Sequence, residues 1–297
     1  MLQNDLRDFI MNWPRVKTIL IILFLCINIF LLVDRLILID RTITIDAETV
    51  ADTIEILKKN NVLIDKAIIP LKMSSMRKLE MQNPFPVPES LAQSILGNDY
   101  EQAFSDETYH FLKDTKTLTI QGCKFAYVNH SPDERITNLN ENTLEENVRD
   151  ILKKFNMDNE YARIKNVVKQ DNQHYLVTIG QEYKGKDIYG CYITMNIASE
   201  GLYSMEGYWL IPDSFIHESF PVRIITGILI DFADDMKLRN EKQVTITDIS
   251  TGYYVDTDMV SAKLKTVEAK PVWRISTDDG SFYLYDTING ELINGED

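Results

Sequence analysis

The sequence contains few of the residues that build metal sites and covalent catalytic centres. Among its 297 residues there are only three cysteines and four histidines, and they form no Cys-x-x-Cys pair and no closely spaced histidine pair. A Gly-x-Ser-x-Gly nucleophile motif and a phosphate-binding glycine loop are also absent. These absences disfavour metal catalysis, serine hydrolysis and nucleotide binding. We therefore predict no catalytic residue, no metal ligand and no cofactor.

Basic residues are in deficit as well. The chain has 31 Lys and Arg against 45 Asp and Glu, for a formal net charge of −14. Residues 1–39 hold 4 of the bases and 3 of the acids, so the remainder carries a net charge of −15. Nucleic acid binding needs a basic footprint on the protein surface. The acidic balance therefore argues against nucleic acid as a partner, and its simplest interpretation is solubility.

Adjacent acids give the only indication of hydrolytic chemistry. The pairs Asp234-Asp235 and Asp278-Asp279 could serve a glycosidase that acts on cell wall. Acids adjacent in sequence rarely supply two opposed carboxylates, and both pairs lie at expected helix-end or turn positions, where solvated Asp is common. A wall-active hydrolase is therefore the weakest of our functional hypotheses.

Aromatic residues cluster in the C-terminal part of the chain. They could line a ligand groove, but their alternating spacing in strand-like segments favours packing within a sheet. The residues concerned are Tyr253, Tyr254, Trp273, Tyr283 and Tyr285.

The three cysteines differ in context. Cys26 lies inside an apolar segment, whereas Cys123 and Cys191 lie in strand-like runs, where a free cysteine commonly serves as a small hydrophobic residue. A disulfide between Cys123 and Cys191 stays open, because pairing depends on geometry that sequence does not supply.

The longest apolar run extends from Val16 to Val33 and contains no acidic residue, glycine or proline. As a helix that rises about 1.5 Å per residue, it spans roughly 27 Å, close to the hydrocarbon thickness of a bilayer. Aromatic and cationic residues typical of a membrane interface lie at the two ends of the run. These interface anchors are Trp13, Arg15, Lys17 and Arg35.

A cleaved secretory signal is the main alternative for this segment. The apolar stretch is longer than usual for such a signal and no small-x-small cleavage site follows it, so we interpret it as an uncleaved signal anchor. The short basic head before a long C-terminal region favours a cytoplasmic N-terminus and an extracellular remainder. The predicted organisation is a cytoplasmic N-terminus at 1–15, a transmembrane anchor at 16–39, a membrane-proximal α+β region at 40–140 and a C-terminal region at 141–297.

Asn28 is the one strongly polar residue deep in the apolar run. A carboxamide in hydrocarbon seeks a hydrogen-bond partner, and an interhelical bond of this kind contributes roughly 0.6 to 2 kcal/mol. The alternative is that Asn28 bonds to its own backbone, or lies near the interface and contacts no protein. We favour contact with a partner helix, because no other feature of the span offers specificity and a small-xxx-small pattern is absent. Helical spacing places five apolar residues on or beside the same face, namely Ile21, Phe24, Leu25, Leu31 and Leu32.

The rest of the chain alternates amphipathic helices with groups of short strands. Thr143 and Glu146 fit a capping box, and turns such as Lys184-Gly185 indicate hairpins. Helices are predicted at 47–60, 89–96, 144–155 and 221–236, and strands at 117–128, 162–169, 175–183, 188–197, 202–210, 244–249, 262–267, 272–277 and 282–285. This order predicts an α+β fold in which two units each pack a helix across an antiparallel sheet.

The N-terminal block, N-W-P-R-V-K-T-I at 12–19 followed by I-N-I-F-L-L at 27–32, resembles the start of the YycI family, accessory proteins of the WalK/WalR (YycG/YycF) two-component system of Gram-positive bacteria. Four further blocks are similar to the ectodomain of that family and to PepSY-type modules. They read Q-E-Y-K-G-K-D-I-Y at 181–189, T-G-Y-Y at 251–254, P-V-W-R-I at 271–275 and T-I-N-G-E at 287–291.

This resemblance implies a regulator without catalysis of its own. Its expected partners are a YycH-like single-pass protein, a WalK-type sensor histidine kinase and the lipid bilayer. Contacts between transmembrane helices would modulate kinase output and thereby cell-wall metabolism, in a direction that differs between organisms and is left open. By this resemblance, Asn28 and its helix face are the expected contact surface. The alternative function is a PepSY-like extracellular inhibitor or binder of a secreted peptidase.

The start of the chain departs from the family pattern. The family pattern normally begins within a residue or two of a Met-Asp-Trp or Met-Asn-Trp start, whereas ten residues precede Met11 here. We therefore hypothesise that Met11 is the initiator and that Met1 to Ile10 are an extension from mis-annotation. N-terminal sequencing of the native protein would contradict this if it found Met1 or Leu2.

Overall fold

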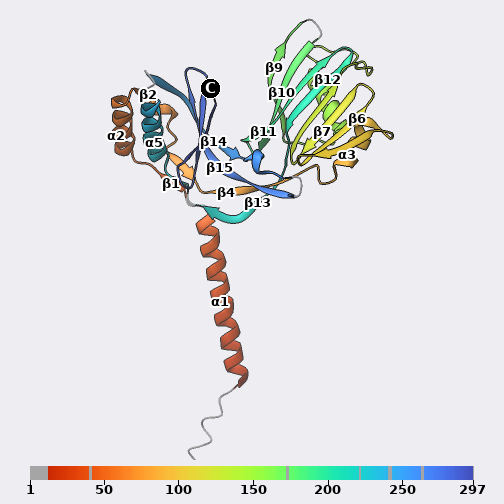
Figure 1. The fold of residues 1–297 in the computed structure, drawn as a ribbon. Helices are drawn as coiled ribbons and strands as arrows, with labels where there is room; N and C mark the ends of the chain where they lie inside the picture. Colours follow the sequence, from red (N-terminus) through yellow and green to blue (C-terminus); the bar gives the residue numbers. More distant parts are fainter. Residues whose placement is uncertain are drawn as a thin grey trace, which may run out of the picture.

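The computed structural model describes residues 13–39, 42–171, 174–220, 222–239, 243–261 and 264–296. One long helix, α1 (Trp13–Ile39), stands apart from a head that is built of helices and a large sheet (Figure 1). Fifteen strands form this sheet, and they pair antiparallel except where β14 runs beside β2 and the start of β11. The predicted α+β class is confirmed.

The head has two lobes, each with its own hydrophobic core. The first lobe contains α2 and α5, which Figure 1 shows on the side of their sheet that faces away from the second lobe. Its elements are β1 (Thr42–Thr44), α2 (Ala47–Lys59), β2 (Val62–Ile64), β3 (Lys72–Ser74), β4 (Met76–Gln82), β13 (Ile211–Phe220), α5 (Ile225–Leu238), β14 (Val244–Tyr254), β15 (Thr266–Thr277), β16 (Phe282–Asp286) and β17 (Leu292–Glu296).

The second lobe is an antiparallel sheet with α3 and α4 against one face. The strand order across this sheet is β9, β10, β11, β12, β8, β7, β6, β5. Its elements are α3 (Pro88–Leu96), β5 (Glu101–Ser105), β6 (Thr108–Lys113), β7 (Lys116–Gln121), β8 (Lys124–Asn129), α4 (Leu144–Lys154), β9 (Ala162–Lys169), β10 (His174–Tyr183), β11 (Lys186–Ala198) and β12 (Gly201–Tyr208).

The helices of the head form where the sequence supplies a cap and an apolar face. Asp46 accepts a hydrogen bond of 2.7 Å from the Thr49 backbone N–H and caps α2, and Val50 and Leu57 are fully buried against α5 and the sheet. The capping box predicted at the start of α4 is wrong in its geometry. Thr143 occupies the N-cap position, but its hydroxyl donates to the Asn138 carbonyl rather than accepting from the helix.

Strand β11 joins the two lobes. Its first residues, Ile188 and Tyr189, pair with Tyr253 and Tyr254 of β14 in the first lobe, while its later residues pair with β12 in the second. Gly190 lies where β11 leaves β14, with φ of +87°, and a Cβ added there would lie 2.3 Å from the Val255 carbonyl oxygen. Only glycine fits this close approach without strain.

The two cores do not follow chain order. The first core combines residues between Ile45 and Met81 with residues between Leu210 and Tyr285, and it also includes Cys123, Tyr183, Ile188 and Cys191. The second core takes its residues from between Phe85 and Trp209. The predicted division of the head at residue 140 stays a prediction, and the hydrophobic clusters group the chain differently.

Several element boundaries differ from the predictions. The strands predicted within 117–128 are β7 and β8, which begin one residue earlier and end one residue later and form a hairpin where Gly122 with φ of +60° turns the chain. The predicted strands at 262–267 and 272–277 meet in the single strand β15, with Pro271 accommodated inside it. Helix α5 begins at Ile225, and Pro221, the predicted start, lies outside the described residues.

Candidate functional site

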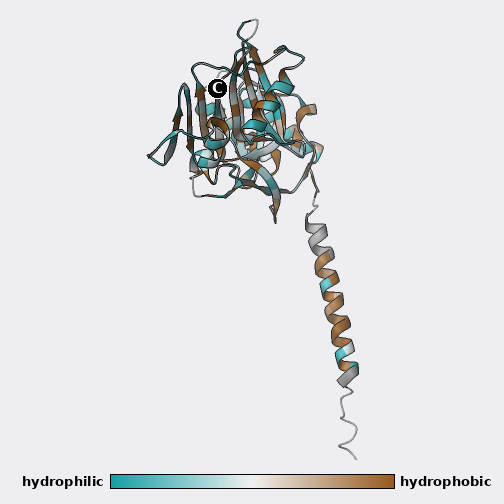
Figure 2. Cartoon of the chain, turned by 90° about the vertical axis from the view of Figure 1, so that its right-hand side faces the viewer, coloured by the Kyte–Doolittle hydropathy of each residue, from teal (hydrophilic) through white to brown (hydrophobic). Residues whose placement is uncertain are grey.

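Helix α1 presents an apolar surface that the rest of the chain does not cover. The stretch Arg15–Leu32 is long and apolar enough to cross a membrane, and none of it is buried against the described residues. Figure 2 shows the hydrophobic colouring along this helix, interrupted at a few polar positions. A helix of this length near an N-terminus fits either a membrane anchor or a signal sequence.

Asn28 lies on this bare surface. At about 100° per residue, the five apolar residues of its predicted contact face lie within about 60° of it around the helix axis. All five side chains are more than half exposed, with fractions of 68% for Ile21, 64% for Phe24, 59% for Leu25, 55% for Leu31 and 59% for Leu32. The structure therefore places the predicted face on one side of α1, and no described residue of the head packs on it.

The predicted interface anchors lie at the two ends of the apolar stretch. Arg15 and Lys17 are exposed in the first turns of α1, and Arg35 lies in its last turns. The side chains of Trp13 and Arg35 lie outside the described residues, as do Met11 and the whole segment before it.

A groove between the two lobes is the largest concave site described in the head. It encloses about 720 Å³ where the face of the second lobe's sheet that carries no helix meets strands β14, β15 and β16 of the first lobe. Aromatic rings from both lobes line it, including Tyr189 and Phe282, whose centroids are 5.9 Å apart. Its size and its mixture of apolar and polar walls are typical of ligand sites.

Charged groups in the groove are unevenly paired. Lys165 of β9 forms an ion pair with Asp187. Arg274 of β15 instead lies over the Phe282 ring, with its guanidinium carbon 4.9 Å from the ring centroid, and its buried Nε has no hydrogen-bond partner. Burial raises the pKa of the nearby Tyr189 phenol to about 12, which keeps this hydroxyl protonated as a donor at neutral pH.

A second cavity of about 390 Å³ continues the groove. It shares Tyr208, Thr257 and Asp258 with the groove and adds Glu107 and Lys124, the latter 5.4 Å from the centroid of the Tyr208 ring. Asp258 is exposed at the point where the two spaces join. The two cavities together form one elongated site, with Arg274 in the larger part, Asp258 at the junction, and Glu107 and Lys124 in the smaller part.

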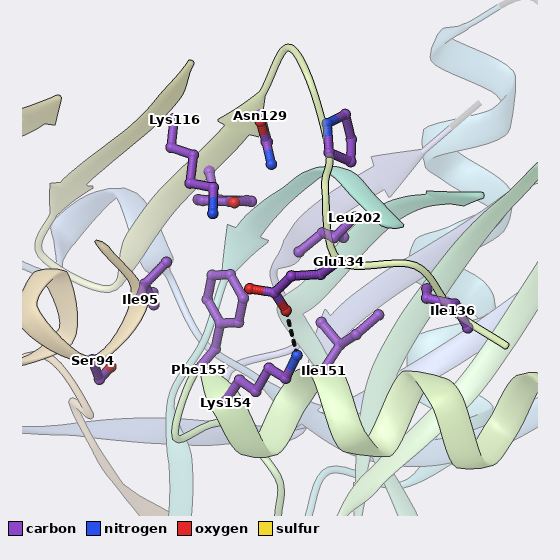
Figure 3. Close-up of a pocket in the computed structure, with 12 residues that line it drawn as sticks. Ser94, Ile95, Lys116, Asn129, Glu134, Ile136, Ile151, Lys154, Phe155 and Leu202 are labelled. Atoms are coloured by element: carbon purple, nitrogen blue, oxygen red, sulfur yellow. Dashed lines mark hydrogen bonds and ion pairs between the residues drawn. The ribbon is translucent and has the colours of Figure 1, made fainter. Parts of the chain in front are cut away.

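A smaller pocket of about 220 Å³ lies inside the second lobe (Figure 3). Its floor contains Tyr127 and Phe155, which meet edge to face with centroids 5.2 Å apart. Figure 3 shows Glu134 reaching from the loop before α4 to Lys154 on the helix, with an O–N distance of 2.6 Å. This ion pair ties the loop across the pocket, so the pocket is more closed than the groove.

The acid pairs that suggested hydrolysis occupy structural positions. Asp278 accepts a hydrogen bond of 3.0 Å from the Thr245 backbone N–H, and Asp279 accepts one of 2.6 Å from the Thr277 hydroxyl, within the turn between β15 and β16. On α5, Asp235 accepts a hydrogen bond of 2.7 Å from the Tyr285 hydroxyl. Neither pair lines the groove or the small pocket.

The aromatic cluster and the cysteines are mostly part of the cores. Four of the five aromatics are no more than 3% exposed, as sheet packing predicts, and the fifth, Tyr254, lines the groove. Cys123 and Cys191 are buried as free thiols, and burial raises both pKa values, that of Cys123 to about 12. Both thiols are therefore protonated at neutral pH and behave as small hydrophobic groups.

Sequence reasoning missed the groove and its arginine. Arg274 lies in a predicted strand between the buried Trp273 and Ile275, so the strand period of two already places it on the opposite face. The opposite wall of the groove could not be inferred from the sequence, since it belongs to the second lobe.

Comparison with known proteins gives no family assignment. No family model matches the sequence, and no curated protein matches it. A crystal structure of an uncharacterized protein from Eubacterium rectale is similar over 82% of this chain and 98% of its own, with 12% identity and a TM-score of 0.49. The Bacillus megaterium YpeB C-terminal domain is similar over 72% of this chain and 97% of its own, with 12% identity and a TM-score of 0.36. Likenesses at this level identify no shared function.

Proposed function

We propose that this protein is a membrane-anchored accessory protein that modulates a WalK-type sensor histidine kinase, together with a YycH-like partner. Helix α1 crosses the membrane with its N-terminus in the cytoplasm, and the head lies outside the cell. The observation that carries the proposal is the bare face of α1 around Asn28, because a carboxamide in hydrocarbon is best satisfied by another helix. The N-terminal block that resembles the YycI family covers this same helix.

The proposal extends to the head. Its two lobes correspond to two PepSY-like units, each with helices on one face of an antiparallel sheet. The packing of α4 in the second core, and of α2 and α5 in the first, supports this interpretation. In this arrangement the head presents a surface outside the cell while α1 contacts the kinase, which links events outside the cell to kinase output.

The test is co-purification of membrane partners with the full-length chain and with Asn28→Leu. This substitution keeps the helix apolar and removes the carboxamide. Loss of an interhelical hydrogen bond of roughly 0.6 to 2 kcal/mol lowers the affinity about 3- to 30-fold, so recovery of the kinase should fall.

Phe30→Leu is the matched control, because Phe30 is 68% exposed and lies on the opposite side of α1. Its recovery of the kinase should equal that of the unchanged chain. Equal recovery with Asn28→Leu would contradict the proposed contact face. Absence of any histidine kinase from all three samples would contradict the kinase proposal itself.

The alternative proposal is a PepSY-like binder of a secreted peptidase. The edge strand β9 favours it, because Val167 and Val168 are 39% and 46% exposed and β9 pairs only with β10 among the described strands. Such an edge can accept an extended segment of another protein. This alternative predicts that the head alone, from Thr42 onward, binds a peptidase, whereas the kinase proposal predicts that residues 11–39 alone retain most partner binding.

A further inference from the structure

The groove between the lobes holds a guanidinium without a partner. Among the described residues, Arg274 makes no ion pair, its buried Nε makes no hydrogen bond, and its guanidinium contacts the Phe282 ring. A buried donor left unpaired is unfavourable, and the contact with the Phe282 ring, 4.9 Å from the guanidinium carbon to the ring centroid, restricts where the guanidinium can lie. Arg274 is therefore positioned to bind a planar anion such as a carboxylate.

The opposite charge lies further along the same site. Asp258 is exposed at the junction of the groove with the second cavity, makes no ion pair within the described part of the chain, and has Glu107 beside it in that cavity. Neither Lys165 nor Arg274 lines the second cavity. Lys124 also lines that cavity, with its ammonium over the Tyr208 ring, so two carboxylates face one ammonium there. The elongated site therefore has the guanidinium of Arg274 in the groove and an excess of negative charge from the junction onward.

We propose that this groove binds a short linear peptide with free ends, whose C-terminal carboxylate contacts Arg274 and whose amino group lies toward Asp258. This inference goes beyond the proposed kinase contact and does not depend on it. A peptide fits three features at once: the separated charges, the aromatic walls and the hydroxyl groups of Thr178 and Thr194, which can bond to amides. Capture of a terminal carboxylate is a recurring mode of peptide recognition.

The groove connects the two lobes, which gives binding a structural consequence. Arg274 and Phe282 belong to the first lobe, while Thr178 and Thr194 belong to the second, and β11 joins them. A peptide that contacts both walls is expected to stabilise one relative arrangement of the lobes.

The test uses the full-length chain in detergent micelles and isothermal titration calorimetry. The probes are the tetrapeptide Phe-Ala-Phe-Ala with free ends, its C-terminal amide and its N-acetylated form. The free peptide should bind at least about tenfold more tightly than the amide, because the amide loses the charge-assisted bonds to Arg274. Arg274→Gln should remove this difference, and Asp258→Asn should remove the preference for the free amino group.

Arg239→Gln is the matched control, since the Arg239 guanidinium also lies over a ring, 5.4 Å from the centroid of Tyr283, but outside the groove. This variant should keep the full preference for the free peptide. Unfolding curves that match the unchanged chain establish that each variant is folded. The proposal is overturned if no probe shows saturable binding at about millimolar concentration, or if Arg274→Gln distinguishes acid from amide as the unchanged chain does. Binding of chitotetraose instead of the peptides would also overturn it.

Discussion

Gly190 shows how a single residue holds the two lobes in their arrangement. Its φ of +87° and the 2.3 Å approach of the Val255 carbonyl oxygen to a built Cβ leave no space for a side chain. The parallel pairing of β11 with β14 ends at this point. The close approach of the two strands, and with it the shape of the groove, therefore depends on the absence of a side chain.

We predict that Gly190→Ala destabilises the head more than Gly280→Ala does. Both glycines have similar positive φ, +87° and +92°, but a Cβ at Gly280 meets nothing within 4 Å. Backbone strain should cost about 1 kcal/mol at either site, and the steric clash should add about 1 to 3 kcal/mol at Gly190. Urea unfolding of both variants measures the difference, and equal losses would show that β11 and β14 can separate freely here.

At the scale of elements, the N-terminal caps of helices α2 and α4 differ in how well the sequence predicts them. The helix predicted at 47–60 forms as α2, with Asp46 as its cap, and the helix predicted at 89–96 ends at Leu96 as α3, just before Gly97. Helix α4 begins after Thr143, but the predicted capping box is absent because the Thr143 hydroxyl bonds within the preceding loop. The loop competes with the helix for the Thr143 hydroxyl, and the four residues 143–146 of the capping-box motif give no indication of this competition.

We predict that Asp46→Ala lowers the free energy of unfolding by about 0.5 to 2 kcal/mol, since the first turn of α2 loses its cap. Glu146→Ala should change it by less than about 0.5 kcal/mol, because Glu146 makes no capping bond. Thermal unfolding of the two variants provides the comparison. A loss for Glu146→Ala as large as that for Asp46→Ala would mean that the capping box operates in solution.

At the scale of the whole molecule, the strands were easier to predict than their partners. Alternation of apolar residues identified strands β7 to β12 of the second lobe and β14, β15 and β16 of the first. It did not identify β1 to β4, β13 and β17 of the first lobe, or β5 and β6 of the second. It gave no indication that β4 pairs with β15, or β2 with β14, because these partners are far apart along the chain. Alternation specifies a face and not a neighbour. The groove was missed for the same reason, since its walls come from strands that meet only in the folded head.

Helix α1, in contrast, could be predicted from the sequence. Its length, its apolar character and the position of Asn28 within it are all local properties of the chain. The sequence predicted the helix and the residues that share a face with Asn28, and the structure places them together without a covering element. A partner on that face is the central claim, and it concerns a surface that the rest of the described chain leaves open.

The most direct measurement of this claim exchanges α1 with the span of an unrelated single-pass protein and then identifies co-purifying kinases by mass spectrometry. The account predicts that α1 on the unrelated head still recovers a histidine kinase, whereas this head on the unrelated helix loses it. Recovery of the kinase by this head on the unrelated helix, together with none by α1 on the unrelated head, would contradict the account and place the contact outside the membrane.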